Sequence, residues 1–342
     1  TEVIVNALVT QGSAIGNLGR FDEAEAIMRG AMLLADKSGH VIAALRARNN
    51  LVSQLVWEAR VSTLLPIMNE SVDLALRYGF AGWGAQHVLS RVVALSSMGD
   101  WDGARSDLAL VEEWDLSELH AALRSSGKAL LAAATGETAV AERYLEEARD
   151  MLSKIDTVPQ VTAVASGISL IHVLLGEWAA ALAVVAGLEG GGNDPFICQY
   201  SSWAAAAAGD RDTIGVLLER SDAFDRLRVN NAIRAQVAAS AATVDGRWDE
   251  GRAGYVAAVA EYRELDYNLE AAILGLEFAA FLGDRFDDAR AAGDAAETWF
   301  GEHDASSVVE RYRANFRGTP APPTGSGSTH KRAVPVDAEQ RA

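Results

Sequence analysis

The sequence contains a single cysteine, Cys198, among 342 residues, so the chain cannot form an internal disulfide. Neither a second cysteine nor a histidine lies near Cys198 in the sequence, which favours a small buried residue over a reactive nucleophile. No run of apolar residues approaches the roughly 18 positions that a membrane-spanning helix requires. We therefore expect a chain without a membrane partner, and the cytoplasm is its default location.

Positive charge is also scarce, because 30 Lys and Arg stand against 47 Asp and Glu, giving a formal net charge of -17. Binding to nucleic-acid phosphates needs clustered Lys and Arg, and the run His330-Lys331-Arg332 is too short to supply such a cluster. The acidic balance indicates a solvated exterior. We expect no direct contact with nucleic acid.

Signatures of catalysis and of cofactor binding are missing. The glycines between Gly12 and Gly19 are not followed by the Lys of a phosphate-binding loop. The glycines of residues 79–84 resemble a dinucleotide fingerprint, but no strand precedes them. The six histidines are dispersed, without the close pair that a zinc site needs. We therefore expect no catalytic residue, cofactor or metal site within this segment, and leave open whether a larger parent protein is an enzyme.

What the sequence does contain is a repeated turn signal. Gly19 is followed by an aromatic residue two positions on and by an alanine five positions on, and degraded copies recur to the end of the chain. Their spacing runs from 33 residues (176 to 209) to 40 residues (19 to 59). The marker positions are Gly19, Ala59, Gly99, Gly136, Gly176, Gly209, Gly246 and Gly283.

Each part of the signal has a physical role in a helical hairpin. Glycine closes the first helix in the left-handed conformation, the aromatic ring fills the seam, and a following Asp suits the next helix N-terminus. Between markers the apolar residues keep helical spacing, as in Ala24, Ile27, Met28, Ala31 and Leu34. The pattern predicts an all-α, right-handed solenoid of about eight antiparallel helical hairpins.

Composition divides this array. We predict helical repeats over residues 1–186, a Gly-rich loop over 187–195 that separates two halves, and further repeats over 196–316. Residues 317–342 are rich in Pro, Gly and Ser without apolar periodicity, which predicts a disordered tail.

The best unit resembles the tetratricopeptide repeat, and the resemblance extends over roughly residues 1 to 315. It implies stacked helical hairpins whose first helices line a concave groove, although these units are longer than the family's usual one. The residues that fall at the family's preferred positions are Leu8, Gly12, Ile15, Gly19, Phe21, Ala24, Met28 and Ala31.

A narrower likeness concerns residues 35–51 and 291–300, which are similar to the C-terminal region of large actinobacterial signalling proteins. In those proteins an ATPase module precedes the repeats, often behind an adenylate or guanylate cyclase domain. LuxR-type regulators share the plan but usually end in a DNA-binding helix-turn-helix, whereas this chain runs into a Pro/Gly/Ser tail. Because the chain begins Thr1-Glu2-Val3, we expect this start to lie inside a larger protein.

The resemblance implies a non-catalytic, ligand- or protein-binding regulatory segment of an ATPase-coupled cyclase. Its partner would be a protein, a peptide or domains of the same polypeptide upstream of Thr1. The alternatives are the inducer-sensing repeats of a LuxR-type regulator and a free-standing protein interaction scaffold.

The unit register assigns candidate partner-binding residues to the concave groove. Arg46, Asn49, Ser53 and Trp57 share one helical face, where Asn and Arg could hold the backbone and carboxylates of a peptide. Alternatively, Asn49 and its neighbour Asn50 satisfy local backbone groups. The groove residues are Asn6, Arg46, Asn49, Ser53, Trp57, Gln86, Gln199, Trp203, Gln236, Glu270 and Glu277.

Overall fold

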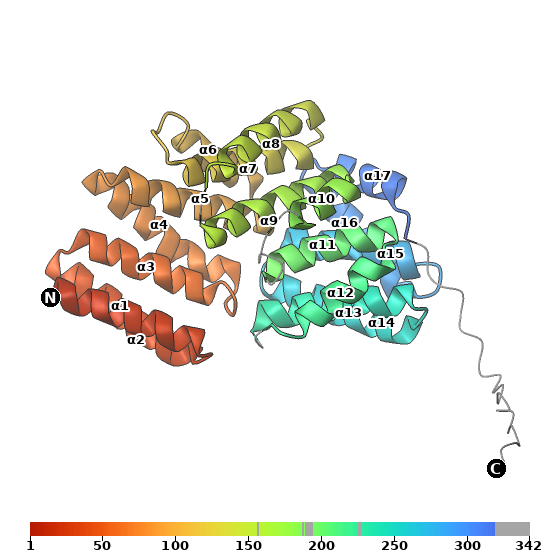
Figure 1. Cartoon of the computed structure of the whole chain (residues 1–342), viewed down its shortest axis with the longest axis horizontal. Helices are drawn as coiled ribbons and strands as arrows, with labels where there is room; N and C mark the ends of the chain where they lie inside the picture. The colour runs from red at the N-terminus through yellow and green to blue at the C-terminus, as the bar shows by residue number, and fades with distance from the viewer. Residues whose placement is uncertain (156, 187, 189–193, 225–226, 319–342) are drawn as a thin grey trace, which may run out of the picture.

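The computed structural model describes residues 1–155, 157–186, 188, 194–224 and 227–318. These residues form helices and no strand, which confirms the all-α prediction (Figure 1). Most of the predicted Gly-rich loop and the predicted tail from residue 319 lie outside the described residues. Within the described part, no helix combines the length and the apolar character needed to cross a membrane.

Consecutive helices pair into the predicted eight hairpins, and one further helix, α17, follows them. The first five hairpins are α1 (Glu2–Asn17) with α2 (Phe21–Ser38), α3 (Val41–Leu55) with α4 (Val61–Tyr78), α5 (Ala81–Met98) with α6 (Trp101–Leu110), α7 (Glu118–Ala134) with α8 (Thr138–Leu152), and α9 (Val158–Leu175) with α10 (Trp178–Ala186). The remaining elements are α11 (Pro195–Ala208) with α12 (Arg211–Ser221), α13 (Arg228–Val244) with α14 (Trp248–Glu264), α15 (Asn268–Leu282) with α16 (Asp287–Glu302), and α17 (Ser306–Asn315).

All eight marker positions fall in the turn inside a hairpin. Six of the marker glycines have positive φ, from 72° at Gly176 to 94° at Gly99, as a left-handed helix end requires. Gly283 is different, because it keeps right-handed helical angles with a φ of -61°. Phe286 follows Gly283 by three positions instead of the two that separate Gly19 and Phe21, so the turn between α15 and α16 is one residue longer.

The first hairpin shows why small residues recur at fixed positions. Helix α2 buries Ala24, Met28, Ala31 and Ala35 along one stripe and turns its charged residues outward. A Cβ added at Gly12 of α1 would lie 2.8 Å from Met28 Cγ, so glycine allows the two helices to approach closely.

The first helices of successive hairpins stack from α5 through α7, α9 and α11 to α13. Because α9 contacts α11 directly, the two predicted halves are packed together across the Gly-rich segment. The second half begins one residue earlier than predicted, since the Asp194 side chain caps α11 by accepting from the Ile197 N–H at 3.0 Å.

Helix α15 leaves the regular stack and turns inward. It contacts α5 and α11, while α17 contacts α7 and α9, so the last helices lie against the third to sixth hairpins. The array therefore closes on itself and fills the region where an open solenoid would leave a groove.

Closure joins the second hairpin to the loop before α15. Asp266 accepts from Arg60 Nη2 at 2.9 Å and from the Ser62 N–H at 3.1 Å. The Val61 N–H donates to the Leu265 carbonyl at 3.0 Å. These bonds connect residues about two hundred positions apart, which a nearest-neighbour solenoid would not contain.

The end of the chain, which we name the C-terminal strap (residues 299–318), follows the hairpin turns of the third to sixth units. The Arg311 Nε donates to the Leu174 carbonyl at 3.1 Å, and the Trp178 Nε1 donates to the Asn315 carbonyl at 2.8 Å. The Gly318 N–H donates to the Ala207 carbonyl at 3.0 Å. The strap thus satisfies carbonyls at the C-terminal ends of α9 and α11, and the packed chain extends beyond the predicted boundary at residue 316.

Candidate functional site

The predicted groove residues of the first hairpins interact with each other near the surface. Arg46 donates to the Asn6 side chain at 2.8 Å, and the Ser53 hydroxyl donates to the Asn49 carbonyl at 2.9 Å. The Asn50 amide donates to the Arg46 carbonyl at 2.9 Å, in agreement with a local structural role for Asn50. Asn6, Arg46 and Asn49 are half-buried and Ser53 is exposed, so these side chains remain accessible to a partner.

Two further groove residues lie near the middle of the array. The Trp57 ring stacks on Phe196 of α11, with 5.0 Å between ring centroids, and so bridges the two predicted halves. Gln86 donates to the Ser90 hydroxyl at 3.2 Å, and its carbonyl oxygen lies 3.2 Å from His120 Nε2. Both residues are half-buried.

The remaining five, which all belong to the second half, have at most 1% of their surface exposed: Gln199, Trp203, Gln236, Glu270 and Glu277. The Gln199 amide donates to the Tyr262 hydroxyl at 2.8 Å. Glu277 accepts from the Ser240 hydroxyl at 2.6 Å and from the Tyr255 hydroxyl at 2.7 Å. Contacts with neighbouring helices bury all five, so they do not line an open groove.

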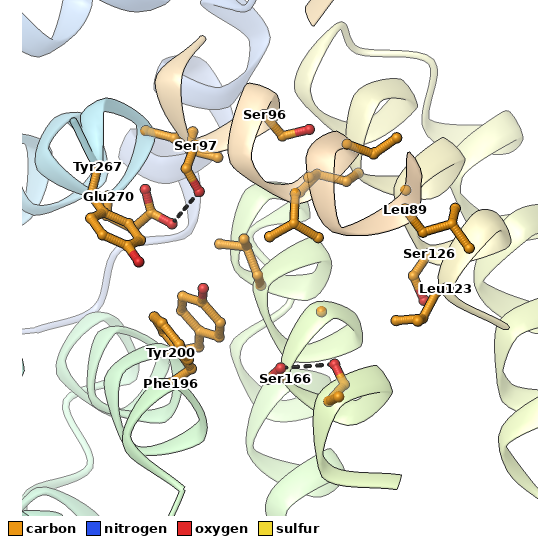
Figure 2. Close-up of a pocket in the computed structure, with 18 of the residues that line it drawn as sticks. Leu89, Ser96, Ser97, Leu123, Ser126, Ser166, Phe196, Tyr200, Tyr267 and Glu270 are labelled. Atoms are coloured by element: carbon orange, nitrogen blue, oxygen red, sulfur yellow. Dashed lines mark hydrogen bonds between the residues drawn. The ribbon is translucent and has the colours of Figure 1, made fainter. Parts of the chain in front are cut away.

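A cavity of about 190 Å³ remains where α15 meets the stack. Its wall comes from α5, α7, α9, α11 and the start of α15, and it is largely aliphatic and aromatic (Figure 2). Because the wall joins residues from both predicted halves, we name this cavity the inner pocket. The sequence did not reveal it, since it depends on the contact between α15 and α5.

Glu270 is the one Asp or Glu side chain of the pocket wall. Ser97 of α5 donates to Glu270 Oε1 at 3.0 Å, whereas Glu270 Oε2 is buried and accepts no hydrogen bond (Figure 2). Burial raises the pKa of Glu270 to about 7, although hydrogen bonds from its own backbone N–H and from Ser97 act in the opposite direction. A carboxylate that changes charge near neutral pH inside an apolar cavity is a feature of functional sites. The sequence analysis placed Glu270 in the groove by the unit register, and its isolation within the apolar segment 269–276 is a further signal that could have marked it.

Other polar groups of the pocket are hydroxyls. The Ser96 and Ser126 hydroxyls are buried without a hydrogen-bond partner. The Tyr200 ring stands beside Phe196 with its hydroxyl directed toward the pocket (Figure 2). The wall therefore offers a few polar contacts in an apolar surrounding, the composition that small-molecule sites share.

The pocket has an accessible side. Val93 is 60% exposed and Ala163 is exposed, and both belong to the wall. A Cβ added at Gly167 would meet Ser126 Cβ at 3.8 Å, an ordinary contact distance, and no closer atom. The wall is therefore partly exposed to solvent at α5 and α9.

Cys198 lies outside the wall of the inner pocket. The Cys198 thiol is buried and donates to the Leu217 carbonyl at 3.6 Å, and burial raises its pKa to about 12, as expected for a small core residue. Within the described ranges, no group of three or more His, Cys, Asp or Glu is arranged to hold a metal ion.

The chain matches neither a family model nor a curated protein. The tetratricopeptide resemblance thus rests on the residues at the unit positions and on the helical hairpins described above.

Proposed function

We propose that this chain is a non-catalytic regulatory segment that binds a small, largely apolar molecule in the inner pocket. The observation that carries the proposal is the pocket itself: an apolar cavity with a buried, incompletely hydrogen-bonded carboxylate, built by residues from both predicted halves. Cavities of this composition are the usual location of small-molecule sites.

The position of the pocket also links ligand binding to the arrangement of the helices around it. A molecule in the pocket touches α5 and α9 on one side and α11 and α15 on the other, so it stabilises the closed arrangement relative to an opened one. The likeness to ATPase-coupled cyclases supports the further proposal that closure restrains or releases domains upstream of Thr1.

Binding can be tested with toluene, a probe of suitable size. A dry cavity of roughly 150 Å³ binds benzene in another protein, so a pocket of about 190 Å³ has room for a monocyclic ring. We expect toluene to raise the melting temperature of the chain and to perturb the NMR signals of residues in the pocket wall.

Gly167 provides the matched pair of variants for this experiment. Gly167→Leu would fill the pocket and abolish the response to toluene, whereas Gly167→Ala would leave most of the space free and retain it. The alanine variant should also be more stable than the parent by about 0.5–1 kcal/mol, because glycine in a helix interior is unfavourable. An equal toluene response in both variants would contradict binding in the inner pocket.

Two alternatives remain. An inducer-sensing segment of a LuxR-type regulator would use the same pocket, and a helix-turn-helix in the full-length gene would identify it.

A protein interaction scaffold is favoured by the exposed apolar side chains of the first hairpin, since Val3, Ile4, Leu18 and Leu33 are each at least 56% exposed. Substituting these four by Ser would abolish partner binding in a scaffold and leave toluene binding unchanged.

A further inference from the structure

The geometry points to an organic amine with a small apolar body as the ligand of the inner pocket, its ammonium group paired with the carboxylate of Glu270. This inference rests on the proposed function and adds the chemical class of the ligand.

Charge is the first reason. Among the residues that the structure describes, the pocket wall includes Glu270 but no Lys, Arg, His, Asn or Gln. An anionic ligand would therefore meet a carboxylate without a compensating cation, which is costly in an apolar site. A cationic ligand would supply a donor for Glu270 Oε2, which is buried without a hydrogen bond.

The aromatic residues beside Glu270 are the second reason. Phe196 and Tyr200 are stacked with 6.2 Å between centroids, and Tyr267 lies 6.4 Å from Phe196. The Tyr200 and Tyr267 rings and the Glu270 carboxylate share one end of the pocket (Figure 2). Ring faces attract organic cations, and they do so more strongly where water is excluded.

The rest of the pocket sets the size and polarity of the ligand body. Leu89 and Leu123 provide aliphatic wall at the other end (Figure 2), Leu170 adds to the aliphatic wall, and a cavity of about 190 Å³ limits the body to about one ring. Ser126 beside these leucines and Ser96 beside Ser97 present neutral hydroxyls and no charge (Figure 2). A one-ring amine such as benzylamine matches both ends.

The pH dependence of binding follows from the groups that face Glu270. These are the Ser97 hydroxyl and the phenols of Tyr200, Tyr262 and Tyr267, whose pKa values burial raises above the ordinary value, so they stay neutral. With a pKa of about 7, Glu270 is largely protonated at pH 6 and largely ionised at pH 8. An ammonium ligand binds the ionised form, so its affinity should rise severalfold between these pH values.

The experiment compares three matched probes by isothermal titration calorimetry: benzylamine, benzyl alcohol and benzoate, which are cationic, neutral and anionic. At pH 8 we expect benzylamine to bind the chain about tenfold more tightly than benzyl alcohol, and benzoate to bind most weakly. Glu270→Gln, which keeps the side-chain shape and removes the charge, should erase the preference for the amine.

The outcomes separate the two proposals. If benzyl alcohol binds as tightly as benzylamine, or if the affinity for the amine falls from pH 6 to pH 8, the amine assignment is wrong while the small-molecule pocket stands. If none of the probes, toluene included, binds more tightly to the parent chain than to Gly167→Leu, both proposals are wrong. Should Glu270→Gln fail to fold, the pH profile of the parent chain decides the question by itself.

Discussion

The turns at Gly19 and Gly99 are built alike but surrounded differently. Both glycines end the first helix of a hairpin with positive φ, 78° and 94°. A Cβ added at Gly19 would meet no atom within 4 Å, whereas one at Gly99 would lie 2.7 Å from His303 Nε2 and 2.8 Å from Trp299 Cζ2. The turn at Gly99 thus supports the C-terminal strap, and the turn at Gly19 lies open.

The difference shows that a unit's local sequence determines its hairpin but not what packs on it. The same contrast appears at the predicted groove positions, where Ser53 of the second hairpin is exposed and Glu277 of the eighth is fully buried. The helices that pack around each position, and not the unit motif, separate the two environments. Three predictions test this comparison.

The largest effect is expected at the bonds that close the array. Asp266→Ala would leave Arg60 and the Ser62 N–H without their partner and would place alanine at a φ of 64°. We expect a loss of about 3 kcal/mol in the free energy of unfolding, measured by chemical denaturation.

The matched control is Asp102→Ala, which removes an ion pair with Arg105 in which the Asp102 side chain is 96% exposed. Such surface pairs contribute little, so the change should stay within about 0.5 kcal/mol. Similar losses in the two variants would mean that the closing bonds contribute no more than a surface pair.

The next effect concerns the two turns. Alanine at positive φ costs about 1 kcal/mol at either glycine. Gly99→Ala should cost about 1–2 kcal/mol more than Gly19→Ala, because its Cβ would also displace Trp299 and His303 of the strap. Thermal unfolding of the two variants measures the difference, and equal melting temperatures would show that the strap is loosely held.

The last effect, about as large as the second, is the pH dependence of the buried Glu277. Burial raises the pKa of Glu277 to about 7, above its ordinary value of 4.5. The folded state therefore holds a proton that the unfolded state has lost, and stability falls as pH rises from about 4.5 to about 7 and is then level. Glu277→Gln should reduce this fall and stabilise the chain by about 1–2 kcal/mol at pH 8.

Denaturation curves at pH 5 and pH 8 check this prediction. Ser53→Ala, at the accessible end of the array, is the control and should leave the pH dependence unchanged. An equal fall in the parent chain and Glu277→Gln would place the titrating group elsewhere.

The hairpins could be predicted because their signal is local. The recurring turn signal, with glycine at seven of its eight markers and the weak copy at Ala59 placed by its spacing, located a turn inside each of the eight hairpins. The closure could not be predicted in this way, since Asp266 reads as an ordinary loop residue and its partner Arg60 is 206 positions away. The unit register assigned Glu270 and Glu277 to the groove, but it did not show the contacts that bury them, with Ser97 of α5 for Glu270 and with Ser240 and Tyr255 for Glu277.

Closure also bears on how the chain acquires its structure. In an open repeat array each unit needs its neighbours alone, so folding can begin at any unit and spread along the chain. Here the backbone N–H of Val229 in α13 donates to the Trp57 carbonyl, so two distant parts of the helical array must meet. Contacts of such high sequence separation slow folding, because the intervening chain must be ordered first. The same contacts make the hairpins that they join unfold together, and not one by one from an end.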